Sequence, residues 1–134
     1  MSMLSTRGAA AVSESMAILR GLAPDGGLYV PEDFPHFSME EIAALGALNY
    51  QARALAILQK FLPDFTADEL KNAIAGAYGA GFDDADIAPV RPVGDWAHAL
   101  ELWHGPTAAF KDMALQMLPH LLTASLKKCG EERG

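Results

Sequence analysis

Lys111 is the residue whose setting most clearly points to chemistry. It lies in the stretch ELWHGPTAAFKDMALQ, which spans residues 101–116, just after a Gly-Pro-Thr turn signal. The turn predicts that a helix begins close to this lysine. Helix N-termini carry partial positive charge, so a lysine there is unfavourable as an ordinary surface charge.

Two interpretations of Lys111 follow from these residues. A lysine amine forms a Schiff base with an aldehyde only when it is neutral. Desolvation by Phe110 and Trp103 would disfavour the charged form, and the positive end of a helix would disfavour it further. The alternative is a lysine whose stem lies over apolar neighbours while its ammonium group reaches solvent. The local residues leave both interpretations open.

Other candidate sites have ordinary structural explanations. The glycines of residues 76–81 follow a predicted helix rather than leading from a strand into one, so they predict a left-handed helix cap and not a phosphate loop. The acidic residues Asp83, Asp84 and Asp86 lack the ligand spacing of a calcium loop and predict a solvated linker. No metal-binding spacing occurs among the four histidines, His36, His98, His104 and His120, so we expect no metal site.

Composition excludes several classes of protein. The 134 residues suffice for one modest core, and the net charge of −7 without a basic stripe disfavours nucleic-acid binding. Cys129 is the only cysteine, which excludes an internal disulfide and Cys-x-x-Cys sites. No apolar run reaches the length of a membrane span, and the first residues lack the apolar core of a signal peptide. We therefore expect a soluble cytoplasmic protein.

The N-terminal third predicts short elements around a turn. Residues 3–8 fit an edge strand or a lead-in loop, and residues 11–22 have a helical apolar spacing. The helix would direct one face inward, formed by Val12, Met16 and either Ile18 or Leu19. Pro24-Asp25-Gly26-Gly27 indicates a turn, and residues 28–30 read as a strand that Pro31 ends.

Two capping boxes predict the starts of helices. Ser38 precedes Glu41 by three residues, and Thr66 precedes Glu69 in the same way. The first box opens a short helix that ends near Gly46. A second helix is expected over residues 50–62, and the second box opens a third over residues 67–78. The expected inward side chains are Ala54, Leu55, Leu58, Phe61 and Leu62 in the second helix, and Leu70, Ile74 and Ala77 in the third.

The remaining segments lead to the lysine and beyond it. Residues 82–96 form a polar, proline-marked connector, and residues 98–105 alternate loosely and predict a strand. A helix is expected over residues 108–128, with Thr107 as its cap. Pro119 lacks an amide donor and predicts a kink or a break in that helix. The expected apolar stripe consists of Leu115, Leu118, Leu122 and Leu126.

The stretch around Lys111 closely resembles the pyridoxal phosphate lysine segment of threonine synthases, commonly written Glu-Leu-Phe-His-Gly-Pro-Thr-x-Ala-Phe-Lys-Asp. Here Trp103 replaces the usual phenylalanine. Upstream pieces agree in order: STRG near the start, GLAPDGGLYVPEDFP after one helix, and APV before the lysine unit. The resemblance covers nearly the whole chain and is specific to the bacterial and fungal type of this enzyme.

The resemblance implies a pyridoxal-phosphate-dependent lyase that converts O-phospho-L-homoserine and water to L-threonine and phosphate. It implies that Lys111 is both the catalytic and the cofactor-binding residue. Thr107 and Asp112 match motif positions, and we interpret them as supports for the turn and helix start. Phe110 is a further supporting residue, and His104 is expected on the substrate side.

The resemblance also sets an expected fold. It implies a mainly α protein with a few short strands (α+β), namely the N-terminal helical domain of threonine synthase over residues 1–86 and the start of the α/β catalytic region over residues 87–134. The family's later Thr-Ser-Gly-Asp-Thr-Gly stretch and glycine-rich phosphate loop are not in this sequence. We therefore expect an N-terminal portion that is inactive alone.

Two other hypotheses stay open. One is a non-catalytic helical domain that binds a protein partner or a complementary catalytic fragment, with self-association through an exposed apolar face of the Lys111 helix. The other is a different pyridoxal phosphate enzyme of the same fold type, which the upstream match disfavours.

Overall fold

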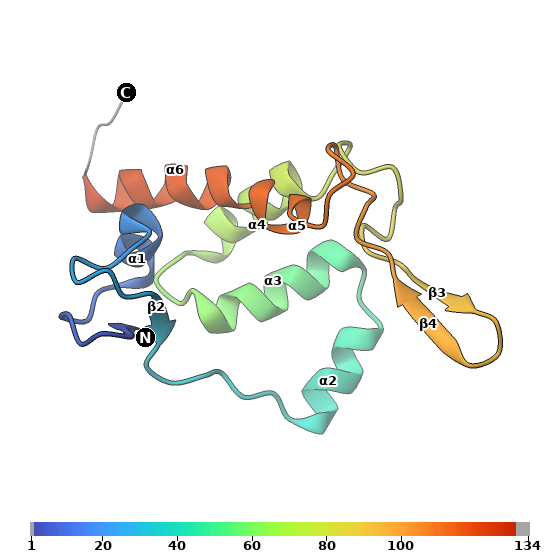
Figure 1. Cartoon of the computed structure of the whole chain (residues 1–134), viewed down its shortest axis with the longest axis horizontal. Coiled ribbons are helices and arrows are strands. Elements are labelled where there is room, and N and C mark those ends of the chain that lie inside the picture. The colour runs from blue at the N-terminus through green and yellow to red at the C-terminus, as the bar shows by residue number, and fades with distance from the viewer. Residues whose placement is uncertain (1, 131–134) are drawn as a thin grey trace.

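The computed structural model describes residues 2–130, and its C-terminal helix lies along one edge of the molecule, with α2 near the opposite edge (Figure 1). In chain order they are β1 (Met3–Ser5), α1 (Glu14–Arg20), β2 (Tyr29–Pro31), α2 (Met39–Gly46), α3 (Tyr50–Phe61), α4 (Ala67–Ala77), β3 (Val90–Val93), β4 (Ala97–Leu100), α5 (Asp112–Leu115) and α6 (Leu118–Cys129). Helices α1 and α4 pack against α6, and α3 packs against α4. The expected mainly α fold with a few short strands is confirmed.

Helix α4 lies at the centre of the core. Its buried face is formed by Leu70, Ala73, Ile74 and Ala77, which includes all three side chains expected inward. Leu70 is fully buried. The rest of the buried cluster comes from the segments around α4 and from α6, and consists of Phe65, Tyr78, Phe82, Ile87, Met117 and Leu121.

Both capping boxes are present. Ser38 accepts a hydrogen bond from the Glu41 amide, and the Glu41 carboxylate accepts one from the Ser38 amide. Thr66 and Glu69 make the same reciprocal pair at the start of α4. Each pair satisfies amide donors that a helix start leaves without an intrahelical partner. Helix α3 also begins as predicted, and most of its expected inward residues pack partly buried against the core: Ala54, Leu55, Leu58 and Leu62.

The expected glycine cap of α4 is wrong. The helix ends at Tyr78, whose φ and ψ are −116° and 64°, and the Tyr78 amide donates to the Ile74 carbonyl. The glycines at 79 and 81 do not have positive φ values. Burial of the Tyr78 ring in the core fixes this helix end, so no left-handed residue is required.

Helix α1 is shorter than expected and turned about its axis. Ser13 caps it, so Val12 lies before the helix and pairs with Met3 in an isolated antiparallel bridge. The fully buried residues are Glu14, Ser15 and Ala17, while Ile18 of the expected apolar face packs partly buried against the core. Two of these three residues have small side chains, and α1 packs against α6.

Strands β1 and β2 pair antiparallel, with Leu4 opposite Val30. The expected edge strand is therefore present, and Pro31 is included at the end of β2 rather than excluded from it. The predicted turn lies between α1 and β2. The Asp25 carboxylate closes it by accepting hydrogen bonds from the amides of Gly27 and Ala9 at 2.9 and 2.7 Å.

The connector and the following strand differ from the prediction. Residues 82–96 are not a plain linker, because Val90–Val93 form β3 and pair antiparallel with β4. The strand predicted over residues 98–105 spans only Ala97–Leu100, and its continuation to Gly105 is irregular. The two strands form a hairpin that projects from the helices (Figure 1).

The long helix expected over residues 108–128 is two helices. The break falls at residues 116–117, and Pro119 lies in the first turn of α6, where a missing amide donor has no cost. The expected leucine stripe is wrong, because Leu115 and Leu118 are exposed. The break rotates α6 so that Met117, Leu121 and Ser125 are the buried residues instead.

The core joins residues from both sides of the boundary expected at residue 86, since Met117 and Leu121 lie in one cluster with Leu70 and Ile74. The division into ranges 1–86 and 87–134 stays a prediction. The ends of those ranges, residue 1 and residues 131–134, lie outside the described residues.

Candidate functional site around Lys111

Lys111 stands immediately before α5 and is exposed. Its neighbours do not desolvate it as predicted, because Phe110 is 66% exposed and Trp103 is 52% exposed. Within residues 2–130 the Lys111 amine makes no hydrogen bond or ion pair, while its carbonyl accepts from the Leu115 amide at 2.8 Å. The amine is therefore accessible to a ligand from solvent.

A buried carboxylate locks the turn before Lys111. Asp112 is fully buried, and its two oxygens accept hydrogen bonds from the amide and the hydroxyl of Thr107, both at 2.8 Å. The predicted cap by Thr107 is wrong. A capping threonine would accept a hydrogen bond from a helix amide, whereas Thr107 donates to Asp112, and α5 has no side-chain cap. The bonds bring together Thr107 and Asp112, the two residues that we expected to support the turn.

Gly105 makes this lock possible. A β-carbon added at Gly105 would lie 2.5 Å from Cβ of Asp112, a distance shorter than van der Waals contact allows. The turn then passes through Ala108, whose φ of 55° is a left-handed value that an alanine rarely adopts. The Ala108 amide donates to the Gly105 carbonyl at 3.0 Å, which closes the turn.

The Asp112 carboxyl is held in its ionised form. Burial by itself would raise its pKa, but hydrogen bonds from the amide and hydroxyl of Thr107, and from Ala109 and Gln116, outweigh burial. The net effect is a pKa below the ordinary value of 3.8. Asp112 is therefore a charged anchor for the residue next to it in sequence, Lys111.

His104 lies one residue before Gly105 and joins two acidic side chains. Its Nδ1 is 2.5 Å from Oδ1 of Asp83, and its Nε2 is 2.8 Å from Oε2 of Glu101. The hydrogen bonds to Glu101 and Asp83 raise the pKa of the imidazole above 6.5. Sequence reasoning placed His104 near the substrate and missed both carboxylates. Glu101 is only three residues away, whereas Asp83 is distant in the chain.

Tyr78 fastens α5 to the core. Its hydroxyl donates to the Met113 carbonyl at 2.7 Å, and its ring meets those of Tyr50 and Phe82 edge to face. Burial raises the pKa of Tyr78 to about 12, so the hydroxyl stays a donor across the neutral range. Sequence reasoning missed this contact, for which the only signal was an aromatic residue at the end of a buried helix face.

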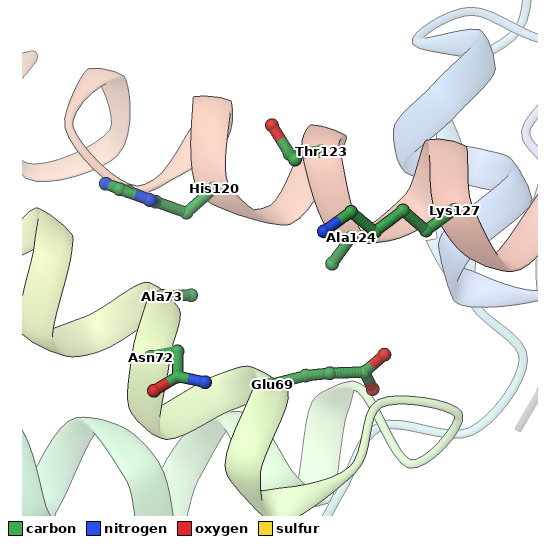
Figure 2. A pocket seen from close by; sticks show the side chains of 7 residues that line it. All are labelled: Glu69, Asn72, Ala73, His120, Thr123, Ala124 and Lys127. Carbon is green, nitrogen blue, oxygen red and sulfur yellow. The ribbon is translucent and has the colours of Figure 1, made fainter. Parts of the chain in front are cut away.

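A separate groove of about 230 Å³ lies between α4 and α6 (Figure 2). Its lining residues are Glu69, Asn72, Ala73, His120, Thr123, Ala124 and Lys127, and Lys111 is not among them. Gly76 gives the His120 ring room, because an added β-carbon would collide with that ring. The groove is thus distinct from the surface that carries the lysine.

The described part of the chain has neither a metal-binding cluster nor a helix that could span a membrane. Among residues 2–130, no three His, Cys, Asp or Glu side chains lie close enough together to hold a metal ion. None of the helices described there is both long and apolar enough to cross a bilayer.

Comparison with known proteins gives consistent matches. The family model described as threonine synthase N terminus matches residues 2–78. A threonine synthase of Pseudomonas aeruginosa is 45% identical over 98% of this chain and 28% of its own length, and one of Methylobacillus glycogenes is 41% identical over 98% and 30%. The chain thus spans about three tenths of the length of these relatives.

A solved structure agrees in three dimensions. The crystal structure of threonine synthase from Brucella melitensis, described as bound to PLP, matches with a TM-score of 0.91 and 38% identity, over 98% of this chain and 28% of that one. The matched family model covers more than half of the chain, and the fold agrees over nearly all of it. The chain therefore belongs to the threonine synthase N terminus family.

Proposed function

We propose that this chain provides the lysine-bearing part of a pyridoxal-phosphate-dependent threonine synthase. The proposed reaction converts O-phospho-L-homoserine and water to L-threonine and phosphate, so the substrate is a small molecule. The observation that carries the proposal is the Lys111 amine, which is accessible and unpaired among the described residues and stands on a turn locked by Asp112. The name of the Brucella melitensis structure supports the cofactor assignment.

The accessible amine of Lys111 fits the aldehyde of the cofactor. Lys111 Nζ would hold pyridoxal phosphate covalently through its aldehyde carbon. When bound, the group supplies an electron sink for carbanion chemistry. The lysine amine, once free, accepts and returns protons at the substrate carbon.

The neighbouring residues position that amine. Asp112 and Thr107 fix the turn through their paired hydrogen bonds, so that Lys111 leaves the loop in one direction. Phe110 and Trp103 present apolar surface on the same segment. We propose that they exclude water from the amine when further polypeptide covers them.

Covalent trapping tests the assignment without requiring turnover. The chain is incubated with pyridoxal phosphate and reduced with borohydride, and the modified lysines are located by mass spectrometry. We expect Lys111 to be labelled in preference to Lys127, which is also exposed. Lys111→Arg should remove that label, and equal labelling of the two lysines would contradict the proposal.

We also propose that the 134-residue chain alone does not turn over substrate. The support is the open setting of Lys111, with Phe110 and Trp103 both more than half exposed. An assay of threonine and phosphate release tests this, and activity that Lys111→Ala abolishes would overturn it.

A cytoplasmic location and the division at residue 86 belong to the same proposal. Fractionation of cells and limited proteolysis, respectively, test them.

A second candidate function is self-association through the segment that carries Lys111. Its support is the apolar surface of α5 and the start of α6, where Leu115 and Leu118 are each about half exposed, and Phe110 just before α5 is exposed too. Light scattering after size exclusion measures the mass. We expect a dimer that Leu115→Asp disrupts while Leu22→Asp, at an exposed leucine elsewhere, does not. A monomer at all concentrations would reject this function.

A further inference from the structure

The His104 ring lies between two carboxylates, with one on each ring nitrogen. Nδ1 faces Asp83 at 2.5 Å and Nε2 faces Glu101 at 2.8 Å. An ionised carboxylate only accepts hydrogen bonds, and both imidazole nitrogens donate only when the ring is protonated. With both carboxylates ionised, two hydrogen bonds at the ring require an imidazolium ion, and the ring is shielded, with its side chain 14% exposed.

The main chain reinforces this contact. The Asp83 amide donates to the His104 carbonyl at 3.0 Å, so residues 83 and 104 are joined through both side chain and backbone. Asp83 directly follows Phe82, which is buried in the core. His104 directly precedes Gly105, where the locked turn before Lys111 begins. The contact thus connects the residue that follows Phe82 of the core to the start of the lysine segment, residues 104–116.

We propose that His104, as an imidazolium, is a positioning residue that clamps the segment leading to Lys111 onto the end of the core. Lys111 matters here because of the function proposed above, but the clamp itself depends only on His104, Asp83 and Glu101. When the ring is neutral, one nitrogen presents a lone pair to a carboxylate, so one of the two hydrogen bonds is lost. The segment is then held less tightly.

The charges around the ring determine the direction of its pH dependence. Glu101 and Asp83 raise the pKa of His104 through hydrogen bonds, burial opposes them, and the charges of Asp83 and Asp84 add to the increase. Arg91 pairs with Asp84 at 2.8 Å, and its positive charge partly offsets the effect of the Asp84 charge on His104. Because the folded-state pKa is raised, the clamp is complete below pH 6.5 and is lost as pH rises through the raised value.

NMR of the nitrogen-labelled 134-residue chain tests the protonation state. We expect both ring nitrogens of His104 to carry protons at pH 6.5, with a titration midpoint above that pH. Glu101→Gln and Asp83→Asn should each lower the midpoint. Asp83 is 77% exposed, so its variant should retain the fold. A ring that is neutral at pH 6.5, or a midpoint unchanged in both variants, would overturn the proposal.

Hydrogen exchange tests the positioning. In His104→Gln we expect the amides of Thr107 and Ala108 to exchange about tenfold faster or more, the factor expected for loss of a charge-assisted hydrogen bond. Amides of α4 should not change. His98→Gln, on the projecting strand β4, is the matched control and should leave all of these rates unchanged.

The outcomes separate the clamp from the proposed function. Unchanged exchange at Thr107 in His104→Gln would reject the clamp, whatever reacts at Lys111. If the clamp positions the amine, trapping of Lys111 by pyridoxal phosphate should slow in His104→Gln while trapping of Lys127 does not. If wild-type Lys111 is not trapped at all, the cofactor assignment fails, and the exchange and NMR results still decide the clamp.

Discussion

Helix α4 and the lysine segment, residues 104–116, are stabilised in different ways. Helix α4 has a reciprocal capping box and a continuous buried face that includes Leu70. The lysine segment has a four-residue helix without a side-chain cap. It is held by polar contacts of Asp112, His104 and Tyr78. Apolar burial fixes the scaffold, and a few hydrogen bonds fix the residues that face solvent.

Leu70→Ala should have the largest effect, because it removes a fully buried side chain from the centre of the core. We expect a loss of about 2–5 kcal/mol in the free energy of unfolding, from lost apolar burial and the cavity that remains. Urea denaturation measures it. Leu22→Ala, at an exposed leucine, should stay within about 0.5 kcal/mol of wild type. Similar losses in the two variants would contradict the role given to α4.

Gly105→Ala should destabilise the lysine segment by overpacking the turn against Asp112. The new methyl group would collide with Cβ and Cγ of Asp112. The Asp112 side chain cannot move away without breaking its hydrogen bonds to Thr107. We expect a loss of about 1–3 kcal/mol. The control is Gly46→Ala at the end of α2, where an added β-carbon meets nothing within 4 Å. Denaturation should show a loss only in the first variant.

Tyr78→Phe removes one bond between the two regions and keeps the ring. The Met113 carbonyl loses its donor, which should lower the free energy of unfolding by about 1 kcal/mol. Hydrogen exchange should become faster in α5 but not in the middle of α4. Tyr29→Phe, whose hydroxyl has only a 3.4 Å contact with Arg20, is the control. Equal acceleration in both helices would show that α5 is not fastened separately.

The two regions also differ in how well their sequences predicted them. The boundaries of α3 and α4 followed from caps and apolar spacing, because each signal lies within a few residues of its effect. The leucine spacing beyond Lys111 predicted the wrong buried face. That face depends on the break at residues 116–117, just before Pro119, which changes the direction in which the later side chains point and which the leucine spacing does not include.

The candidate site was predictable only in part. The motif singled out Lys111, Thr107 and Asp112 from neighbouring positions, and the last two are indeed bonded to each other. The local residues left an exposed Lys111 open as one of two interpretations. The partner of His104 at Asp83 was not predictable, because it depends on how the hairpin of β3 and β4 returns the chain to the end of α4, and no local pattern encodes that path.

Asp112→Asn should have the smallest effect at neutral pH, because an asparagine can keep both contacts. Its amide oxygen accepts from the Thr107 amide, and the Thr107 hydroxyl can rotate to accept from the asparagine nitrogen. Asp112→Ala removes both contacts and should accelerate exchange of the Thr107 amide about tenfold or more. The Asn and Ala variants therefore separate the shape of the lock from its charge.

The contribution of the Asp112 charge should become measurable in acid, where the carboxylate is protonated. Its pKa is lowered in the folded chain, so its contribution to stability is complete above pH 3.8 and is lost as pH falls through the lower folded-state value. Wild type should therefore show faster Thr107 exchange in that range, relative to amides of α4, and Asp112→Asn should not. If the two chains behave alike in acid, the carboxylate charge does not hold the turn, and the lysine segment depends on shape as the core does.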